Sequence, residues 1–245
     1  MRSFLAAAQF LTILPIRTSF DTAEIGRSTP YFPVVGLLIG GAVAALDHYV
    51  FNVCFPPAIS AMLSVIALAA ASGALHLDGL ADTADGFLSS RPKERILAIM
   101  RDSRIGTMGA IALIAILGLK VAALASTADA LRWRALMLAP IAGRCMLLAA
   151  MTRAPYARPD GGLAGVYLSY RKTWHALFAL IVFAAAAYAL MNWRGLLIAA
   201  GCIIVTITFN AYSRRKIGGI TGDTLGAVCE LVETFVLLAA LEIPV

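Results

Sequence analysis

The sequence predicts an all-α membrane protein: a single domain over residues 1–245, built as a polytopic helical bundle of about seven transmembrane helices. Of the 245 residues, 60% are hydrophobic and only 14% are charged, and the mean hydropathy is +0.84, whereas soluble domains carry about a quarter charged residues. The apolar residues form continuous blocks of about 20, the length a helix needs to cross a bilayer. These blocks lack the alternating pattern of barrel strands.

The N-terminal segment 4–14 is apolar but only about half a span long, and Pro15 and Arg17 follow it. We find no small-residue cleavage site after it, so a retained interfacial or re-entrant helix is favoured over a removed secretory signal. Seven longer apolar blocks follow, and each is predicted to span the membrane: 34–55, 58–77, 105–126, 135–151, 173–191, 195–212 and 225–243.

The basic residues predict the orientation of these spans. With the N-terminus in the cytoplasm, fifteen of the 20 Lys and Arg residues fall in inner segments, three in outer segments and two within spans. Cytoplasmic loops carry such an excess of Lys and Arg, which predicts a multi-pass membrane protein with the connections 78–104 and 152–172 in the cytoplasm. Nucleic acid binding is disfavoured, because no basic stripe alternates with exposed aromatic residues. The four cysteines stand at no metal-ligand spacing.

The first inner connection begins with an acidic string. Asp78, Asp82 and Asp85 are spaced i, i+4 and i+7, which places them on one face of a helix. Three neighbouring carboxylates repel each other and are unfavourable near hydrocarbon. A hard cation such as Mg²⁺ suits them, because it takes carboxylate oxygens and keeps sites for water or phosphate. The alternative is that one aspartate caps a helix while the others are solvated.

A second acidic string surrounds the start of the last span. Asp223 and Glu230 are also spaced i, i+7, and Glu233 lies near the same face. An unpaired carboxylate in a span is expensive, so a functional role is the default interpretation. Gly79 in the first string and Gly222 in this one allow the backbone to approach a ligand or a neighbouring helix. The alternative is helix packing, with a buried glutamate paired to a base such as Arg144.

Three arginines are candidates for binding phosphate, because the planar guanidinium group suits phosphate oxygens. Arg101 and Arg104 are spaced i, i+3 and fit a role in setting topology equally well. Arg144 lies within a span, where it needs a counter-charge or an anionic ligand. Carboxylate clusters and arginines at one face of a bundle suit metal-assisted cleavage of a diphosphate. No Ser, Cys or His is convincingly placed as a nucleophile, which favours direct attack by an acceptor hydroxyl.

Several strings of the chain resemble the cobalamin synthase family, the adenosylcobinamide-GDP ribazoletransferases. The most specific are LDGLADTADG at 77–86 and GITGDTLGA at 219–227; the others are FLTILP at 10–15, YFPVVG at 31–36, RDSRIG at 101–106 and Gly143-Arg144. The resemblance implies that adenosylcobinamide-GDP reacts with α-ribazole or its 5′-phosphate to give adenosylcobalamin or its phosphate, releasing GMP. Homo-oligomers and association with other cobalamin-assembly enzymes stay open.

The resemblance also implies roles for the candidate residues. Asp78, Asp82, Asp85 and Asp223 are expected to hold Mg²⁺, and Glu230 is a further candidate in the catalytic set. One uncommitted carboxylate is expected to serve as base for the attacking hydroxyl, without an assignment to a residue. Phosphate and substrate binding falls to the remaining candidates: Arg101, Arg104, Arg144, Gly79 and Gly222.

Two other functions stay open from the sequence. One is a different membrane enzyme that uses diphosphates, either an aspartate-rich prenyltransferase or a CDP-alcohol phosphotransferase. The latter expects alanine and arginine where Asp82 and Thr83 stand. The other is a transporter in which Glu230, Glu233 and Asp47 relay protons or ions.

Overall fold

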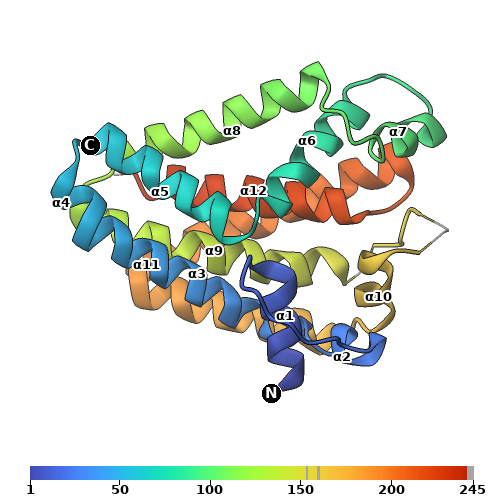
Figure 1. Ribbon diagram of the computed structural model, residues 1–245, viewed down its shortest axis with the longest axis horizontal. Helices are drawn as coiled ribbons and strands as arrows, with labels where there is room; N and C mark the ends of the chain where they lie inside the picture. The colour runs from blue at the N-terminus through green and yellow to red at the C-terminus, as the bar shows by residue number, and fades with distance from the viewer. Residues whose placement is uncertain (153, 159–160, 242–245) are drawn as a thin grey trace.

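The structure is a computed structural model that describes residues 1–152, 154–158 and 161–241. These ranges form a helical bundle whose long helices run roughly lengthwise (Figure 1), and they contain no β-strand beyond a single bridge between Tyr156 and Ile220. The predicted all-α class is therefore confirmed. In chain order the elements are α1 (Arg2–Leu11), α2 (Thr22–Gly26), η1 (Thr29–Tyr31), α3 (Phe32–Leu46), η2 (Asp47–Phe51), α4 (Asn52–Cys54), α5 (Pro57–Ala71), α6 (Leu75–Phe87), α7 (Lys93–Ile99), α8 (Thr107–Ser126), α9 (Asp129–Met151), α10 (Leu163–Ser169), α11 (Thr173–Ile217) and α12 (Gly222–Ala239).

The helices are those of a membrane protein, but the count of seven spans is not confirmed. Four helical segments are long and apolar enough to cross a membrane: Thr29–Cys54, α8, α9 and α11. A fifth results if α5 and α6, which meet at 91°, count as one broken span. α12 carries three carboxylates in its 18 residues, and the predicted end of its span at 243 lies outside the described residues.

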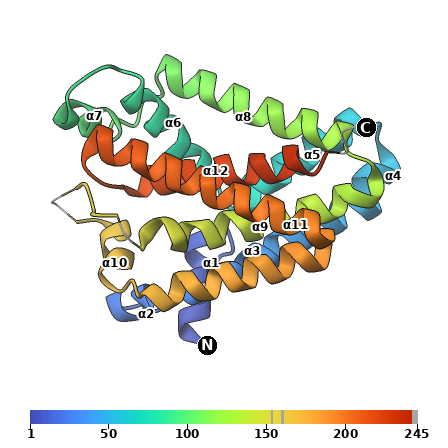
Figure 2. The ribbon, with the colours of Figure 1, turned by 180° about the vertical axis from the view of Figure 1, so that it is seen from behind.

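The helix α11 consists of two arms. Asn192 interrupts it with a left-handed backbone (φ 54°, ψ −142°), and the arms 173–191 and 193–217 fold back on each other as separate orange helices (Figure 2). The predicted segments 173–191 and 195–212 correspond to these two arms. The predicted interfacial helix at 4–14 corresponds to α1, while its depth in a bilayer stays a prediction.

The helix α9 forms the centre of the bundle, packed against α3, α11 and α12. In the most apolar 18-residue stretch of α9, 83% of the residues are buried. α3 approaches it closely through glycine: a Cβ on Gly36 would lie 2.5 Å from the carbonyl oxygen of Pro140, and a Cβ on Gly40 equally close to that of Met137. Small residues allow this kind of backbone contact between membrane helices.

A second glycine contact joins α6 to α12 and positions the two acidic strings. A Cβ on Gly79 would lie 2.8 Å from the carbonyl oxygen of Asp223, and a Cβ on Gly226 would lie 3.1 Å from that of His76. Any side chain at Gly79 would therefore force the helices apart. The sequence indicated that Gly79 contacts either a ligand or a neighbouring helix, and this contact is with a helix.

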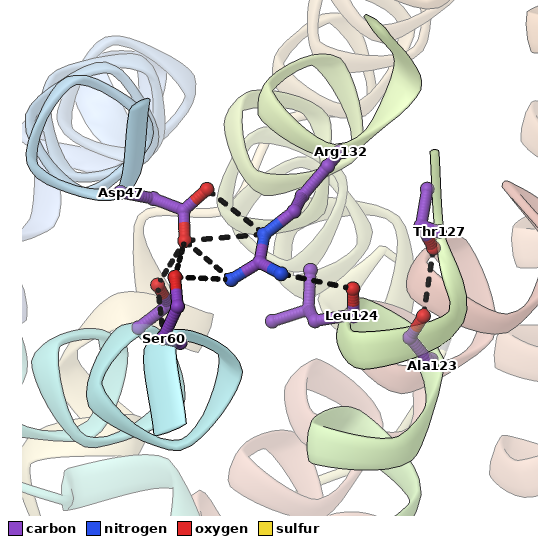
Figure 3. Close-up of polar contacts among 7 residues, drawn as sticks. Asp47, Ser60, Ala123, Leu124, Thr127 and Arg132 are labelled. Carbon is purple, nitrogen blue, oxygen red and sulfur yellow. Dashed lines mark hydrogen bonds and ion pairs between the residues drawn. The ribbon is translucent and has the colours of Figure 1, made fainter. Parts of the chain in front are cut away.

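At the opposite end of the bundle, Asp47 and Arg132 form a fully buried ion pair (Figure 3). Arg132 Nη2 lies 2.6 Å from Asp47 Oδ1, and the hydroxyl groups of Ser60 and Ser64 donate to the same oxygen. Arg132 also donates to the carbonyl oxygen of Leu124. The sequence placed Arg132 in an outer connection, but α9 begins at Asp129, before the predicted start at 135, and carries Arg132 into the interior.

Candidate active site

A cavity of about 460 Å³ lies at the end of the bundle that carries α6, α7 and α10. Its volume is typical of small-molecule sites. Half of the ten predicted site residues line it: Asp78, Gly79, Arg101, Gly222 and Asp223. The two acidic strings, separated by about 140 residues of sequence, therefore meet at one cavity.

The start of α12 sets the position of Asp223. Gly218, with φ +78°, ends α11, and Thr221 caps α12 by accepting a hydrogen bond from the amide of Thr224. The strand-like stretch before α12 also pairs with the α9–α10 connection. Ala157 donates to the carbonyl oxygen of Ile220, and Ile220 donates to that of Pro155, both at 2.9 Å.

This backbone pairing brings Arg158 to Asp223. Arg158 Nη2 lies 2.5 Å from Asp223 Oδ2, and their side chains are 16% and 20% exposed. Arg158 lines the cavity, and its buried Nε has no hydrogen-bond partner within the described ranges. In the sequence, Arg158 is one of fifteen basic residues predicted to lie in inner segments, and nothing in its local sequence distinguishes it from the others.

The carboxylates on α6 crowd one another. Asp82, which lies outside the four long apolar helices, has its pKa raised to about 7 by burial and by the neighbouring charges of Asp78, Asp223 and Asp85. Burial also raises the pKa of Asp223, although the guanidinium group of Arg158 opposes this shift. Burial is the main cause of both shifts, and the neighbouring carboxylates add to it.

Asp85 contacts α8 instead of the cavity. Its two carboxylate oxygens accept hydrogen bonds from the amides of Gly106 and Gly109, at 2.7 and 2.8 Å. A Cβ at either glycine would lie 2.4 Å from a carboxylate oxygen, so glycine is required at both positions. Asp85 therefore caps the N-terminus of α8, where a negative charge is favourable, and this matches the capping alternative that the sequence left open.

The metal site that the sequence predicted is not preformed. Within the described residues, no three His, Cys, Asp or Glu side chains lie close enough together to hold a metal ion. Asp223 is paired with Arg158, and Asp85 is bound to α8. The donor set still has the chemistry that Mg²⁺ prefers, since carboxylates of α6 and α12 face one region.

Of the three predicted phosphate-binding arginines, Arg101 lines the cavity and the other two do not. Arg104 is an exposed residue whose Nη2 lies 2.7 Å from Asp102 Oδ2, and this contact lowers the pKa of Asp102 to about 2. Arg144 is buried in the bundle, where it pairs with Glu233.

Glu230 is likewise inside the bundle. Lys120 Nζ lies 2.7 Å from Glu230 and 2.9 Å from Glu233, so these residues and Arg144 form a four-membered network of two cations and two anions. This pairing is the structural alternative that the sequence left open for Glu230 and Arg144. The three acids of the transporter alternative, Glu230, Glu233 and Asp47, are therefore all paired with cations.

Aromatic side chains from three distant segments complete the cavity wall: Phe10 from α1, Tyr156 from the α9–α10 connection, and Tyr167 from α10. The rings of Phe10 and Tyr167 lie 4.9 Å apart, and Tyr167 packs edge-on against Phe32. These residues were not predicted from the sequence as parts of the site, because a wall assembled from single aromatic residues has no sequence spacing.

Comparison with known proteins identifies relatives over nearly the whole chain. A family model described as cobalamin-5-phosphate synthase matches residues 3–241. Among curated proteins, the adenosylcobinamide-GDP ribazoletransferase of Acetivibrio thermocellus is 38% identical over 97% of this chain and 96% of its own length. That of Roseiflexus sp. is 42% identical (94% and 86%), and that of Klebsiella pneumoniae subsp. pneumoniae is 38% identical (98% and 100%). No solved structure matches the chain.

Proposed function

The chain belongs to the cobalamin-5-phosphate synthase family, and from this premise we propose how its cavity carries out the family's reaction. It has the activity of an adenosylcobinamide-GDP ribazoletransferase in cobalamin synthesis. The observation that carries this conclusion is the family match over residues 3–241, together with the cavity where both acidic strings meet.

In the proposed reaction, a ribose hydroxyl of α-ribazole or its 5′-phosphate attacks the phosphorus nearer the cobinamide. The bond from that phosphorus to the bridging oxygen breaks, and GMP leaves with the second phosphate. The hydroxyl proton passes to a carboxylate of the site that the metal ion leaves uncommitted. The aromatic wall of Phe10, Tyr156 and Tyr167 supports the binding of α-ribazole, because planar rings pack well against a nucleoside base.

Arg101 and Arg158 are the proposed phosphate-binding residues. Both line the cavity, and arginine donates in a fork that matches phosphate oxygens. Arg158 has a donor to spare, since its Nε is buried without a partner while Nη2 contacts Asp223. Arg104 and Arg144 are not given this role, because one points to solvent and the other pairs inside the bundle.

Mg²⁺ is the proposed cofactor, and Asp78, Asp82 and Asp223 are the residues proposed to hold it. The support is electrostatic: burial and the neighbouring carboxylates both raise the pKa of Asp82, and a cation bound there would offset both effects. Bound there, Mg²⁺ would neutralise the diphosphate and polarise the reacting phosphorus. Asp223 must first exchange Arg158 for the cation, and Arg158 is then released toward the diphosphate.

The apolar helices make the chain a membrane protein, and we place it in the inner membrane with the cavity facing the cytoplasm. With Arg132 removed to the bundle interior, fifteen basic residues lie in predicted inner segments and two, Arg134 and Arg194, in outer segments, and this distribution supports the orientation. Association with further copies or with other cobalamin-assembly enzymes stays a prediction.

The test uses the protein in liposomes with adenosylcobinamide-GDP, α-ribazole 5′-phosphate and Mg²⁺. Mass spectrometry should detect GMP and cobalamin phosphate in equal amounts, and EDTA should abolish both. Turnover with a CDP-alcohol or prenyl diphosphate donor, and none with adenosylcobinamide-GDP, would contradict the proposed reaction. Full turnover in EDTA would contradict only the proposed role of Mg²⁺ and not the proposed reaction.

A further inference from the structure

A second cavity, of about 540 Å³, lies on another face of α9. Leu147 and Met151 line the active-site cavity, whereas their neighbours Met146 and Ala150 line this one. The other walls include the two arms of α11, which diverge toward the end of the bundle that carries the active-site cavity (Figure 2). We call this cavity the α9–α11 groove.

The groove is apolar along most of its length and opens on the outside of the bundle. Its apolar side chains from the two arms include Leu177, Leu180, Ile203 and Ile207. Leu177 and Ile207 are 58% and 63% exposed. Because both arms belong to a helix apolar enough to span a membrane, the surroundings of this opening are lipid chains.

One end of the groove is polar and basic. Thr173, at the start of one arm, and Arg214, near the end of the other, both line it, and none of the described residues that line it is acidic. Within the described part of the chain, Arg214 forms no ion pair. Lys172 and Arg215 stand next to these residues in the sequence, so positive charge collects around this end.

Asn210 adds an unsatisfied acceptor at the same end. Its Nδ2 donates to the carbonyl oxygen of Ala150 at 3.0 Å, which fixes the orientation of the amide. Its Oδ1 is buried and has no hydrogen-bond partner within the described residues. A buried acceptor of this kind favours a donor that the described residues do not supply.

We infer that the α9–α11 groove binds one anionic phospholipid of the phosphatidylglycerol type. Its acyl chain would lie between the arms of α11, its phosphate at Arg214, and a headgroup hydroxyl would donate to Asn210 Oδ1. Basic pockets between membrane helices bind anionic headgroups in this way. A choline headgroup fits less well, because it brings its own positive charge and carries no hydroxyl donor.

The structure offers an internal comparison at the other end of α11. A second groove there is lined by Arg134 and Arg194, but their guanidinium groups lie over the rings of Trp133 and Trp193, at 5.4 and 5.9 Å from the ring centroids. These arginines therefore have partners within the chain. Arg194→Gln is the matched control for Arg214→Gln, since each removes one exposed arginine from α11.

Native mass spectrometry of the full chain, with equal phosphatidylglycerol and phosphatidylcholine in the detergent, tests the inference. The wild type should retain one phosphatidylglycerol in preference to phosphatidylcholine. Arg214→Gln should reduce that preference about fivefold, the contribution of one basic residue near an anionic lipid, while Arg194→Gln should leave it unchanged. Ala211→Trp, which fills the groove from an exposed position, should remove the bound lipid.

Equal retention of both lipids by the wild type would overturn the inference without depending on the folding of any variant. An equal loss in the Arg194→Gln and Arg214→Gln proteins would also overturn it. A photoactivatable phosphatidylglycerol provides an independent localisation: cross-links should fall on 146–152, 173–180 or 203–214, and cross-links confined to the part of α11 around Asn192 would contradict the site.

Discussion

Replacing Arg158 by glutamine tests the proposed phosphate site most directly. The Arg158–Asp223 pair is 16% and 20% exposed, so it lies between surface pairs, which contribute up to about 1 kcal/mol, and buried pairs, where removing one partner costs about 3–5 kcal/mol. We assign Arg158 an intermediate contribution of about 2.7 kcal/mol. If Arg158 stabilises the diphosphate in the transition state by this amount, its loss should slow the reaction about 100-fold.

The same substitution should have the opposite effect on cation binding. Glutamine leaves Asp223 without its cationic partner, so Mn²⁺ binding in the absence of donor, followed by electron paramagnetic resonance, should become tighter. Slower GMP release combined with tighter Mn²⁺ binding is not expected from general damage to the fold. A misfolded variant would lose both GMP release and Mn²⁺ binding.

Arg104→Gln is the matched control, because Arg104 is an exposed arginine paired with Asp102 and lies outside the cavity. It should retain GMP release within about twofold of the wild type. If the Arg158→Gln protein released GMP within threefold of the wild-type rate, or if Arg104→Gln slowed it equally, the assignment of Arg158 would be refuted.

Three further predictions follow from the contacts. Gly79→Ala should lower both the melting temperature and the transfer rate, because its Cβ would lie 2.8 Å from the Asp223 carbonyl oxygen; wild-type values for both would contradict the close contact. Glu233→Gln should reduce the free energy of unfolding by about 3–5 kcal/mol in a detergent denaturation assay, since it leaves Arg144 and Lys120 short of one anion; an unchanged midpoint would contradict this. The raised pKa of Asp82 means that the folded state binds more protons than the unfolded state between about pH 4 and 7, so in EDTA stability should fall as the pH rises through this window. Asp82→Asn should flatten that dependence, and an unchanged pH profile would contradict it.

The fold class was predictable because hydrocarbon imposes a strong pattern. Blocks of apolar residues must become helices when no water is available to the backbone, and the two arms of α11 were found in this way. Charged residues limited the prediction, because helices can bury them in pairs. Arg132 lies in α9 outside the predicted apolar block, and Asp47 neutralises its charge.

The candidate site was predictable only in part, for a related reason. Helical spacing reveals that Asp78 and Asp82 share a face, but it cannot show that Asp85 is bound by two amides of α8. It also cannot show which residue neutralises a buried charge. Glu230 and Arg144, which are both paired inside the bundle, could therefore not be distinguished in the sequence from ligand-binding residues. Arg158 reaches Asp223 through contacts between two connections, and such contacts leave no periodic pattern in the sequence.

The pairing of those two connections has a consequence for how freely the family can vary. Two main-chain hydrogen bonds, between Ala157 and Ile220 and between Ile220 and Pro155, align Arg158 with Asp223. Backbone bonds do not depend on side-chain identity, so the alignment of the charged pair does not by itself require particular side chains at 156 and 157. Gly219 is different, because a Cβ there would lie 2.2 Å from the Pro155 carbonyl oxygen. The constraint that this alignment places on evolution should therefore fall on one residue without a side chain and on the two charges that it helps to align, while Tyr156 is constrained separately by its place in the cavity wall.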